Sequence, residues 1–394
     1  MCCIGRMKEV DLLELLKAIP DPRVERTKRH ALVNIIVMVI VAVIGGANTW
    51  KEIVAFTKLR EAWLAQLLDL RRGIPSESTF KRVFRALDPD AFARAFSQWV
   101  QTVVGQDLQG KLVAIDGKTL RGSSKKKGKQ HPLHLVTAWV AENHVVFGQV
   151  ATAAKSNEIT AIPELLKMLV LKGATVTIDA MGCQRSIAKQ IIDAGADYVL
   201  ALKGNQSSLH TEVQDAFATR WINDEPMEPS QQYQEVDDGH GRQITRTVLA
   251  LETSGWLSDK QDWPRLRSIV QVHSVRRQGQ TTTEEYRYYL SSHRPDARLL
   301  ARQIRRHWST ENEQHWVLDV AFREDESRIR TGHGPDNFAA VRRLALSLLK
   351  KDNTTNLSLK AKRKLAGWDT NYLAKVIACA LPLATSNQAV STVG

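Results

Sequence analysis

The sequence has few cysteines and no long hydrophobic run. Its 394 residues include four cysteines, an adjacent pair at Cys2 and Cys3 and single residues at Cys183 and Cys379. This spacing predicts neither a disulfide framework nor a set of zinc-binding cysteine pairs, so we expect a chain that works in a reducing cytoplasm. The longest apolar run, residues 35–44, is shorter than the ~18 residues that span a bilayer. Residues 1–30 contain no signal-peptide core, and we therefore expect no membrane partner.

What the sequence has in excess is positive charge. Lysine and arginine number 55 against 42 aspartates and glutamates, a formal net charge of +13. Apolar residues make up 43% and charged residues 25%, which is ordinary for a folded protein and excludes a disordered or collagen-like chain. Such a basic surplus in a folded chain indicates a polyanionic partner, with nucleic acid the first choice and an anionic membrane surface the second.

Hydrophobic periodicity changes at about residue 111. Residues 8–105 show helical spacing, with a buried helix at 31–44 and cap candidates at Asn48-Thr49 and at Ser76 and Ser78. From 111 the pattern predicts strands and helices in the order β-β-β-α-β-α-β, followed by a β-rich stretch and further helices. We expect a helical N-terminal domain at 1–110, an α/β domain at 111–351 with a β-rich insertion at about 221–296, and a basic helical tail at 352–394. The predicted core strands are 112–115, 133–140, 145–150, 175–178 and 198–202, and those of the insertion are 243–251, 267–276 and 282–290.

Two predicted strands end in aspartate. Asp116 follows the strand at 112–115 and Asp179 the strand at 175–178, each directly after an isoleucine. Residues at the carboxyl ends of neighbouring strands line the crevice in which open α/β sheets bind ligands. An aspartate at this position also caps turns and helices, and that alternative stays open for each residue alone.

A third acid lies on a late helix. Glu311 falls on the helical stripe that contains Ile304, Trp308 and Leu318. A glutamate facing the core is costly unless it is paired or bound to a metal. Pairing with a nearby arginine is the alternative; together with the two aspartates we favour a metal site. Other acids compete with Glu311 for this role: Glu313, Asp319, Glu324, Asp325 and Glu326.

The chemistry of three carboxylates without cysteine suits a hard cation. Oxygen ligands favour Mg²⁺ or Mn²⁺, and two such ions side by side serve phosphoryl transfer. His307, Glu311 and His315 are spaced four residues apart, which leaves zinc as a distant alternative.

Short motifs along nearly the whole chain match one known family. They are Asp21-Pro22-Arg23, Gly73-Ile74-Pro75-Ser76 with Thr79-Phe80, Ala114-Ile115-Asp116-Gly117-Lys118, Ile178-Asp179-Ala180, Leu202-Lys203-Gly204-Asn205-Gln206, His240-Gly241-Arg242, and Glu311-Asn312 followed by His315-Trp316-Val317-Leu318-Asp319-Val320. A chain with these motifs resembles the DDE transposases. It is most similar to the insertion-sequence group that includes the H-repeat-associated proteins.

This resemblance implies a fold, a site and a reaction. The fold is α/β, with a ribonuclease H-like core that carries a β-rich insertion. Asp116, Asp179 and Glu311 become the catalytic and metal-binding triad, with Mg²⁺ or Mn²⁺ as cofactor in two positions. The reaction is hydrolysis of a phosphodiester at the element ends and transfer of the freed 3′-OH into target DNA. The partners are double-stranded DNA and a second copy of the chain, in a bacterial cytoplasm at the nucleoid.

In one respect the sequence departs from its relatives. Related transposases often carry Tyr, Arg and Lys around the glutamate, at positions that are Ile304, His307 and Leu318 here. Of these, His307 still suits a phosphate contact. The residues we expect at DNA are Lys118, Arg121, Lys125, Lys126 and Lys127 after the first aspartate, Lys203, Arg242 and His307, and Lys81, Arg82 and Arg85 on the helix after Ser76. A solvated loop and a core-covering helix are the alternatives for the two basic clusters.

Two other functions fit the same sequence. A decayed or domesticated transposase would bind DNA without cutting it, and an intact acid triad counts against this. A structure-specific nuclease would cut without joining. A cleavage and joining assay separates these functions.

Overall fold

The computed structural model describes residues 11–104, 108–124, 131–152, 158–223, 226–239, 241–253, 257, 262–378 and 380. They form two compact units. The first, a helical unit, draws on residues 1–103, 120–133 and 317–394, and the second, a sheet unit, on residues 104–119 and 134–316. No helix among the described residues is long and apolar enough to cross a membrane.

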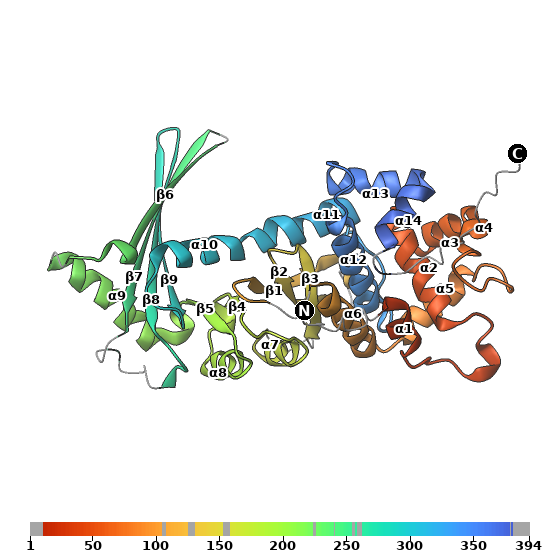
Figure 1. Ribbon diagram of the computed structural model, residues 1–394, viewed down its shortest axis with the longest axis horizontal. Helices are drawn as coiled ribbons and strands as arrows, with labels where there is room; N and C mark the ends of the chain where they lie inside the picture. The colour runs from red at the N-terminus through yellow and green to blue at the C-terminus, as the bar shows by residue number, and fades with distance from the viewer. Residues whose placement is uncertain are drawn as a thin grey trace, which may run out of the picture. The chain divides into compact units, whose positions relative to one another are not determined.

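The helical unit begins with short helices around a buried one (Figure 1). They are α1 (Leu12–Lys17), α2 (Leu32–Ile44), α3 (Trp50–Leu59), α4 (Glu61–Leu64), α5 (Glu77–Ala86) and α6 (Pro89–Val104). Every residue of α2 except Val33 is buried, because its side chains are apolar on all faces. Thr49 forms a capping box with Glu52, and the hydroxyl of Ser76 accepts the backbone N–H of Thr79. Of the cap candidates, the structure therefore uses Thr49 and Ser76.

The helices at the end of the chain pack into this same unit. They are α11 (Trp316–Phe322), α12 (Gly334–Lys351), α13 (Leu359–Trp368) and α14 (Thr370–Ile377). The Asn337 amide of α12 donates to the carbonyls of Phe84 (3.0 Å) and Leu87 (2.9 Å), which close α5. The Arg363 guanidinium of α13 donates to the carbonyl of Val43 (2.7 Å) at the end of α2. The unit thus takes in residues from 317 onward, whereas we expected a division at 351; residues 381–394 of the expected tail lie outside the described residues.

The sheet unit is built on nine strands in the order β3-β2-β1-β4-β5-β9-β8-β7-β6. The strands are β1 (Leu112–Leu120), β2 (Leu133–Val140), β3 (Val145–Thr152), β4 (Thr175–Ile178), β5 (Asp197–Leu202), β6 (Gln232–Gly239), β7 (Arg242–Glu252), β8 (Ser268–Gln278) and β9 (Thr281–Ser291). The helices are α7 (Glu158–Lys167), α8 (Arg185–Asp193), α9 (Ser207–Ile222) and α10 (Ala297–His307). Strand β4 is parallel to β1 and β5, and β9 is antiparallel to β5. The fold is therefore mixed α/β, as expected.

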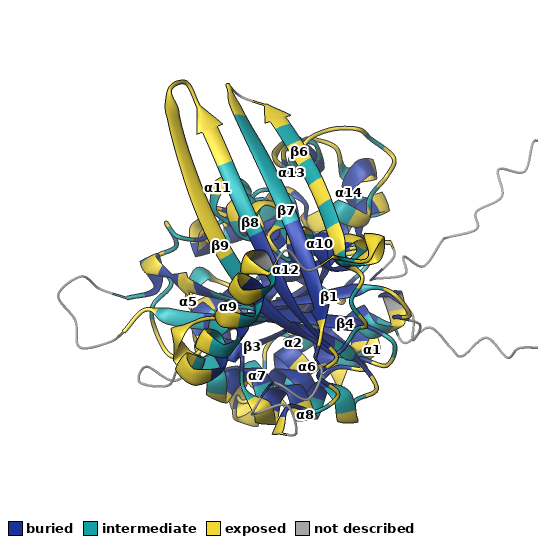
Figure 2. Cartoon of the chain, turned by 90° about the vertical axis from the view of Figure 1, so that its left-hand side faces the viewer, coloured by how far each residue is buried: buried dark blue, intermediate teal, exposed yellow. Residues whose placement is uncertain are grey.

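The insertion continues the sheet instead of forming a separate layer. Strands β6 to β9 are antiparallel to one another, and β9 joins them to β5. Figure 2 shows β7 to β9 buried where they approach the core and exposed toward their far ends. Their buried halves and α10 share one apolar cluster that includes Val248, Val270, Tyr289 and Leu300.

Three expectations about elements were wrong. Strand β6 was missed, because its charged sequence leaves it largely exposed at the sheet edge. Strand β1 does not end at Asp116 but runs on to Leu120. The sequence pattern also predicts helices at about 58–70 and 157–172, and both are shorter in the structure, because turns follow Leu64 and α7 ends at Lys167.

Candidate active site

Two aspartates lie at the same level of neighbouring strands. The parallel ladder of β1 and β4 pairs Leu112 with Thr175 and ends with the pair Ile115 and Ile178. Asp116 and Asp179 are the next residue on each strand, although β1 itself continues. Parallel strands lie about 4.8 Å apart, so equal register brings the two carboxylates to one edge of the sheet. The expected meeting of these acids therefore follows from the strand register.

The carboxylate of Asp116 lies in an unfavourable electrostatic environment. Burial raises its pKa to about 7, and the charges of Asp179, Glu158 and Glu311 also raise it. The backbone N–H of Gly117, which donates to Oδ1 at 2.8 Å, opposes this shift. The imidazole of His315 lies beside this carboxylate, with its Nδ1 3.5 Å from Oδ2 of Asp116. An acid with such a pKa beside three others suits a site that binds a cation.

The side chain of Asp179 caps a short helix and also lies close to other acids. Its Oδ1 accepts the N–H of Met181 at 3.1 Å and so caps a short 3₁₀ helix, Ala180–Gly182. Burial raises the pKa of Asp179, and Glu158 raises it further, whereas the Lys203 ammonium lowers it. The capping alternative therefore holds for Asp179, and the same side chain also lies close to other acids.

Glu311 does not face the core, contrary to the prediction from helical spacing. Residues Glu311–His315 form a π-helix between α10 and α11, and its extra residue per turn shifts the faces of the helix. As a result Thr310 and Gln314 are buried, whereas Trp308 and Glu311 are exposed. Glu311 still lies near enough to Asp116 to raise its pKa. No ion pair or hydrogen bond to the Glu311 side chain occurs within the described ranges.

Most acids that competed with Glu311 have partners of their own. Glu313 bonds His144 (2.6 Å) in the sheet unit. In the helical unit Glu324 pairs with Arg343 (2.8 Å), Asp325 accepts the N–H of Arg121 (3.2 Å), and Glu326 bonds Nε of Arg323 (2.8 Å). Within the described residues, Glu311 is the acid of this stretch whose charge raises the pKa of Asp116, which identifies it as a neighbour of that aspartate.

Sequence analysis missed a fourth carboxylate, Glu158. It is the first residue of α7 and raises the pKa of both Asp116 and Asp179. Its Oε1 lies 2.8 Å from Nε2 of His134 on β2. A glutamate in the first turn of a helix is typical of helices in general. The sequence therefore holds no signal that separates Glu158 from an ordinary first-turn acid.

Two residues expected at DNA point inward instead. The Lys118 side chain is buried, with Nζ 3.5 Å from the carbonyl oxygen of His315. The His307 ring bonds the Thr177 hydroxyl at 2.9 Å, and burial lowers its pKa to about 4. His307 is therefore neutral at pH 7, and we withdraw both residues as phosphate contacts. The zinc alternative is wrong too, because His307, Glu311 and His315 turn to different surroundings.

The other basic residues remain accessible or lie outside the described ranges. Lys203 and Arg242 are exposed in the sheet unit. Lys81, Arg82 and Arg85 are exposed on α5, where Lys81 pairs with Glu77 at 2.6 Å. Arg121 is exposed with its Nε 3.7 Å from Asp325. Residues Lys125, Lys126 and Lys127 lie outside the described residues.

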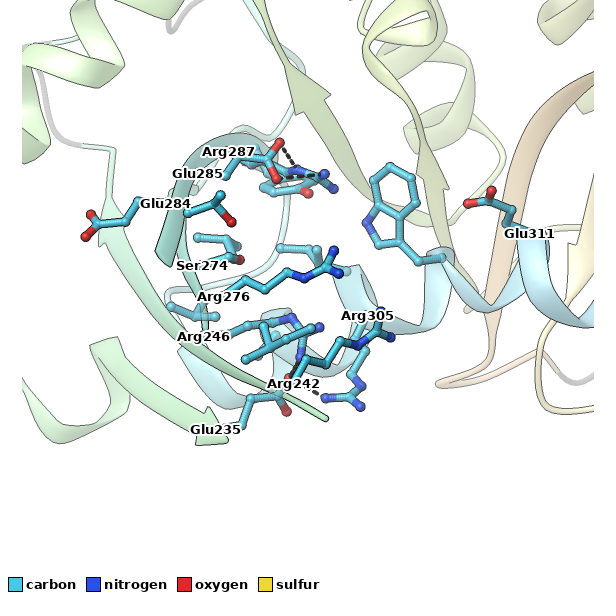
Figure 3. A pocket seen from close by; sticks show the side chains of 18 of the residues that line it. Glu235, Arg242, Arg246, Ser274, Arg276, Glu284, Glu285, Arg287, Arg305 and Glu311 are labelled. Carbon is cyan, nitrogen blue, oxygen red and sulfur yellow. Dashed lines mark hydrogen bonds and ion pairs between the residues drawn. The ribbon is translucent and has the colours of Figure 1, made fainter. Parts of the chain in front are cut away.

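A basic cavity opens beside Glu311. It has a volume of about 810 Å³. Figure 3 shows arginines of β7, β8 and α10 that point into it, with Glu311 at one end. The Arg287 guanidinium lies 4.6 Å from the centre of the Trp308 ring, and Arg305 is neutralised by Glu235 (2.7 Å) and Asp237 (2.9 Å). The lining arginines are Arg242, Arg246, Arg276, Arg287 and Arg305.

The donor set suits a hard cation by its chemistry. Its members are carboxylates only, and their mutual repulsion raises the pKa of Asp116. Within the described part of the chain no three acidic, imidazole or thiol groups converge on one point as they stand. The acids are thus close enough to interact electrostatically, but they are not arranged around a common point as ligands of one ion would be.

The protein is therefore of the mixed α/β class, and its candidate site is a group of carboxylates at the edge of the parallel strands. Comparison with known sequences identifies its family. Residues 107–348 match the family model described as the transposase DDE domain, and residues 13–100 match the domain associated with it. The chain belongs to the transposase DDE domain family, which confirms the resemblance seen in the motifs.

Similar proteins extend over nearly the whole chain. The putative transposase YncI of Escherichia coli O157:H7 is 40% identical over 93% of this chain and 94% of its own length. The H repeat-associated putative transposase YhhI of Escherichia coli K12 is 37% identical over 93% and 97%. Among solved structures, a piggyBac transposase synaptic complex with hairpin DNA aligns over 95% of this chain and 82% of its own, at 9% identity and a TM-score of 0.40.

Proposed function

We propose that this protein is a DNA transposase that hydrolyses a phosphodiester at each end of its element and joins the freed 3′-OH to target DNA. The observation that carries this proposal is the register of β1 and β4, which brings Asp116 and Asp179 to one sheet edge with Glu311 within electrostatic reach. The strand order from β3 to β5 supports a ribonuclease H-like core. Membership in the DDE domain family supports the reaction class.

In this proposal Asp116, Asp179 and Glu311 hold Mg²⁺ or Mn²⁺, in two positions. Bound ions would activate the attacking oxygen and stabilise the leaving oxygen of the displacement. The protein contributes a partly buried Asp116 whose pKa is raised to about 7, so that a positive charge nearby favours the loss of its proton. It also contributes Asp179, which its bond to the Met181 N–H holds in place.

DNA binding in the proposal rests on exposed cations. Lys203 lies near Asp179, and Arg242 lines the cavity beside Glu311. In the proposal both would contact phosphates of the DNA that is bound at the acids. Arg121, the loop lysines and the α5 cations would extend the contact. Two element ends call for two copies of the chain, and we propose a homodimer on double-stranded DNA in the bacterial cytoplasm, at the nucleoid.

The test is a cleavage assay on DNA that carries the element's own ends, with Mg²⁺ and the full chain. Asp116→Asn and Asp179→Asn each remove one negative charge and keep the shape of the side chain. We expect nicking to fall by at least 100-fold while DNA affinity is kept or rises, because less negative charge faces the phosphates. Asp215→Asn is the control, an exposed aspartate on α9.

The same assay separates the other two functions. A protein that binds the ends but never nicks them with Mg²⁺ or Mn²⁺ would be a binding protein without catalysis. A protein that nicks but leaves no joined product with target plasmid would be a nuclease. Full nicking by Asp116→Asn would remove the acids from the mechanism.

A further inference from the structure

Glu158 lies against the strand that carries Asp116. It is the first residue of α7, and its Oε1 occupies the space where a side chain at Gly117 would begin. A Cβ at position 117 would overlap both this oxygen and Nε2 of His134. Glycine at 117 therefore permits the approach of Glu158 to β1, one residue from Asp116.

The orientation of Glu158 is fixed by two hydrogen bonds in series. Nε2 of His134 lies 2.8 Å from Oε1 of Glu158, and Nδ1 of His134 lies 2.8 Å from the hydroxyl of Thr119. An ionised carboxylate only accepts hydrogen bonds, so Nε2 of His134 is the donor to Glu158, and the Thr119 hydroxyl is the partner of Nδ1. This arrangement engages one oxygen of Glu158 and leaves the other for a ligand. Carboxylates that bind metals are oriented by outer partners of this kind.

We propose that Glu158 is a fourth carboxylate of the divalent-ion site, with His134 as its positioning residue. This inference rests on the proposed function. Glu158 is only 18% exposed in its side chain, and within the described ranges no lysine or arginine pairs with it. A third negative charge beside Asp116 and Asp179 is unfavourable unless a cation joins them. The simpler reading, an acid that ties α7 to β2 through His134, explains the bond to histidine but not the position beside both aspartates.

The test measures Mn²⁺ binding to the full chain by isothermal titration calorimetry, without DNA. Glu158→Gln should weaken Mn²⁺ binding roughly tenfold or more, as the loss of a ligand or its support does. Glu158→Asp keeps the charge and should lose less. The matched control is Glu164→Gln on the same helix, where Glu164 is exposed and pairs with Lys167 at 2.7 Å; its Mn²⁺ affinity should stay that of the unmodified chain.

A double-mutant cycle tests the geometry. Gly117→Ala should displace Glu158 and weaken Mn²⁺ binding in the unmodified chain, but should add little in the Glu158→Gln background. His134→Ala should weaken binding 10- to 100-fold, and His134→Gln, whose amide can donate to Glu158, should recover part of the loss. Additive effects of Gly117→Ala and Glu158→Gln would overturn the proposal.

The failure of this inference can be told from that of the proposed function. If Asp116→Asn abolishes Mn²⁺ binding and Glu158→Gln leaves it unchanged, the ion site stands and Glu158 is structural. If the unmodified chain binds no Mn²⁺ at all, the ion site and the role of Glu158 fail together. A loss confined to Asp116→Asn, Asp179→Asn and Glu158→Gln, with Glu164→Gln unaffected, supports the fourth carboxylate.

Discussion

The protonation of Asp116 links its surroundings to the stability of the protein. Its pKa is about 7 in the folded state against 3.8 for an ordinary aspartate. Between these values the folded state keeps a proton that the unfolded state has lost, so the free energy of unfolding falls as pH rises. Each pKa unit corresponds to about 1.4 kcal/mol. We expect Asp116→Asn to be more stable than the unmodified chain by on the order of 2–4 kcal/mol at pH 8 in EDTA.

This difference should depend on pH and on metal. Because Asn resembles the protonated acid, the two proteins should be about equally stable near pH 4 and diverge up to pH 7. Urea denaturation at several pH values measures the difference in the free energy of unfolding between the two proteins, with Asp215→Asn on α9 as the control. Mg²⁺ should stabilise the unmodified chain at pH 8 and not Asp116→Asn. An equal response of both proteins to pH would contradict the assigned environment of Asp116.

Two glutamates of different burial, Glu324 and Glu311, should behave in opposite ways. Glu324 and Arg343 form an ion pair with both side chains fully buried, so Glu324→Gln should lower the free energy of unfolding by about 3–5 kcal/mol. Glu311 is exposed, so Glu311→Gln should change it by no more than about 0.5 kcal/mol and instead lower nicking. Melting temperature and nicking with Mg²⁺, measured on both variants, check this pair. Strong destabilisation by Glu311→Gln would show that it is a structural acid.

At the scale of elements, local signals predicted most of the fold. The apolar helix α2, the caps Thr49 and Ser76, and strand β4 were found because each depends on neighbouring residues. The π-helix at Glu311–His315 was not predicted, because its sequence pattern is also that of an α-helix. The two kinds of helix differ in their backbone hydrogen bonds, which the sequence does not show. For the site, sequence spacing found Asp116 and Asp179, whereas Glu158 depends on a contact across the fold and could not be found that way.

The joining of α12 to α5 can be tested with one residue. Asn337 is fully buried and donates to the last carbonyls of α5. Asn337→Ala leaves these acceptors without a donor, at a cost of about 1–3 kcal/mol per buried group. We expect a lower melting temperature. Asn356→Ala, an exposed position after α12, is the control and should have no effect. Equal melting temperatures for the two variants would contradict a structural role for the link.

At the scale of the whole molecule, chain order does not follow spatial grouping. Residues from 317 onward pack with the N-terminal helices, held by contacts such as Arg363 to the end of α2. These contacts join residues more than 300 positions apart in sequence, as the separation of Arg363 from Val43 shows. Periodicity describes what each helix buries and not which partner buries it, so the sequence alone could not predict this grouping.

Net charge is the property of the whole chain that bears most directly on DNA. A surplus of +13 predicts binding that weakens with salt, with log K falling by ~0.9 per phosphate neutralised as log[salt] rises. If Lys125, Lys126 and Lys127 each neutralise a phosphate, replacing all three with Ala should reduce the slope by ~2.7. The melting temperature should not change, because the substitutions remove charged side chains and no apolar group. Fluorescence anisotropy with a DNA duplex at several salt concentrations measures the slope.

A matched triple variant separates contact from net charge. Lys17, Lys167 and Lys189 are exposed lysines that pair with Glu14, Glu164 and Asp193 on their own helices. Replacing them with Ala removes the same three charges as the loop variant does. If the loop touches DNA, the loop variant should lose slope and the control should keep it, since the counterions are released where phosphates are neutralised. Equal losses would mean that DNA responds to overall charge alone, and a slope near zero in the unmodified chain would remove the electrostatic argument.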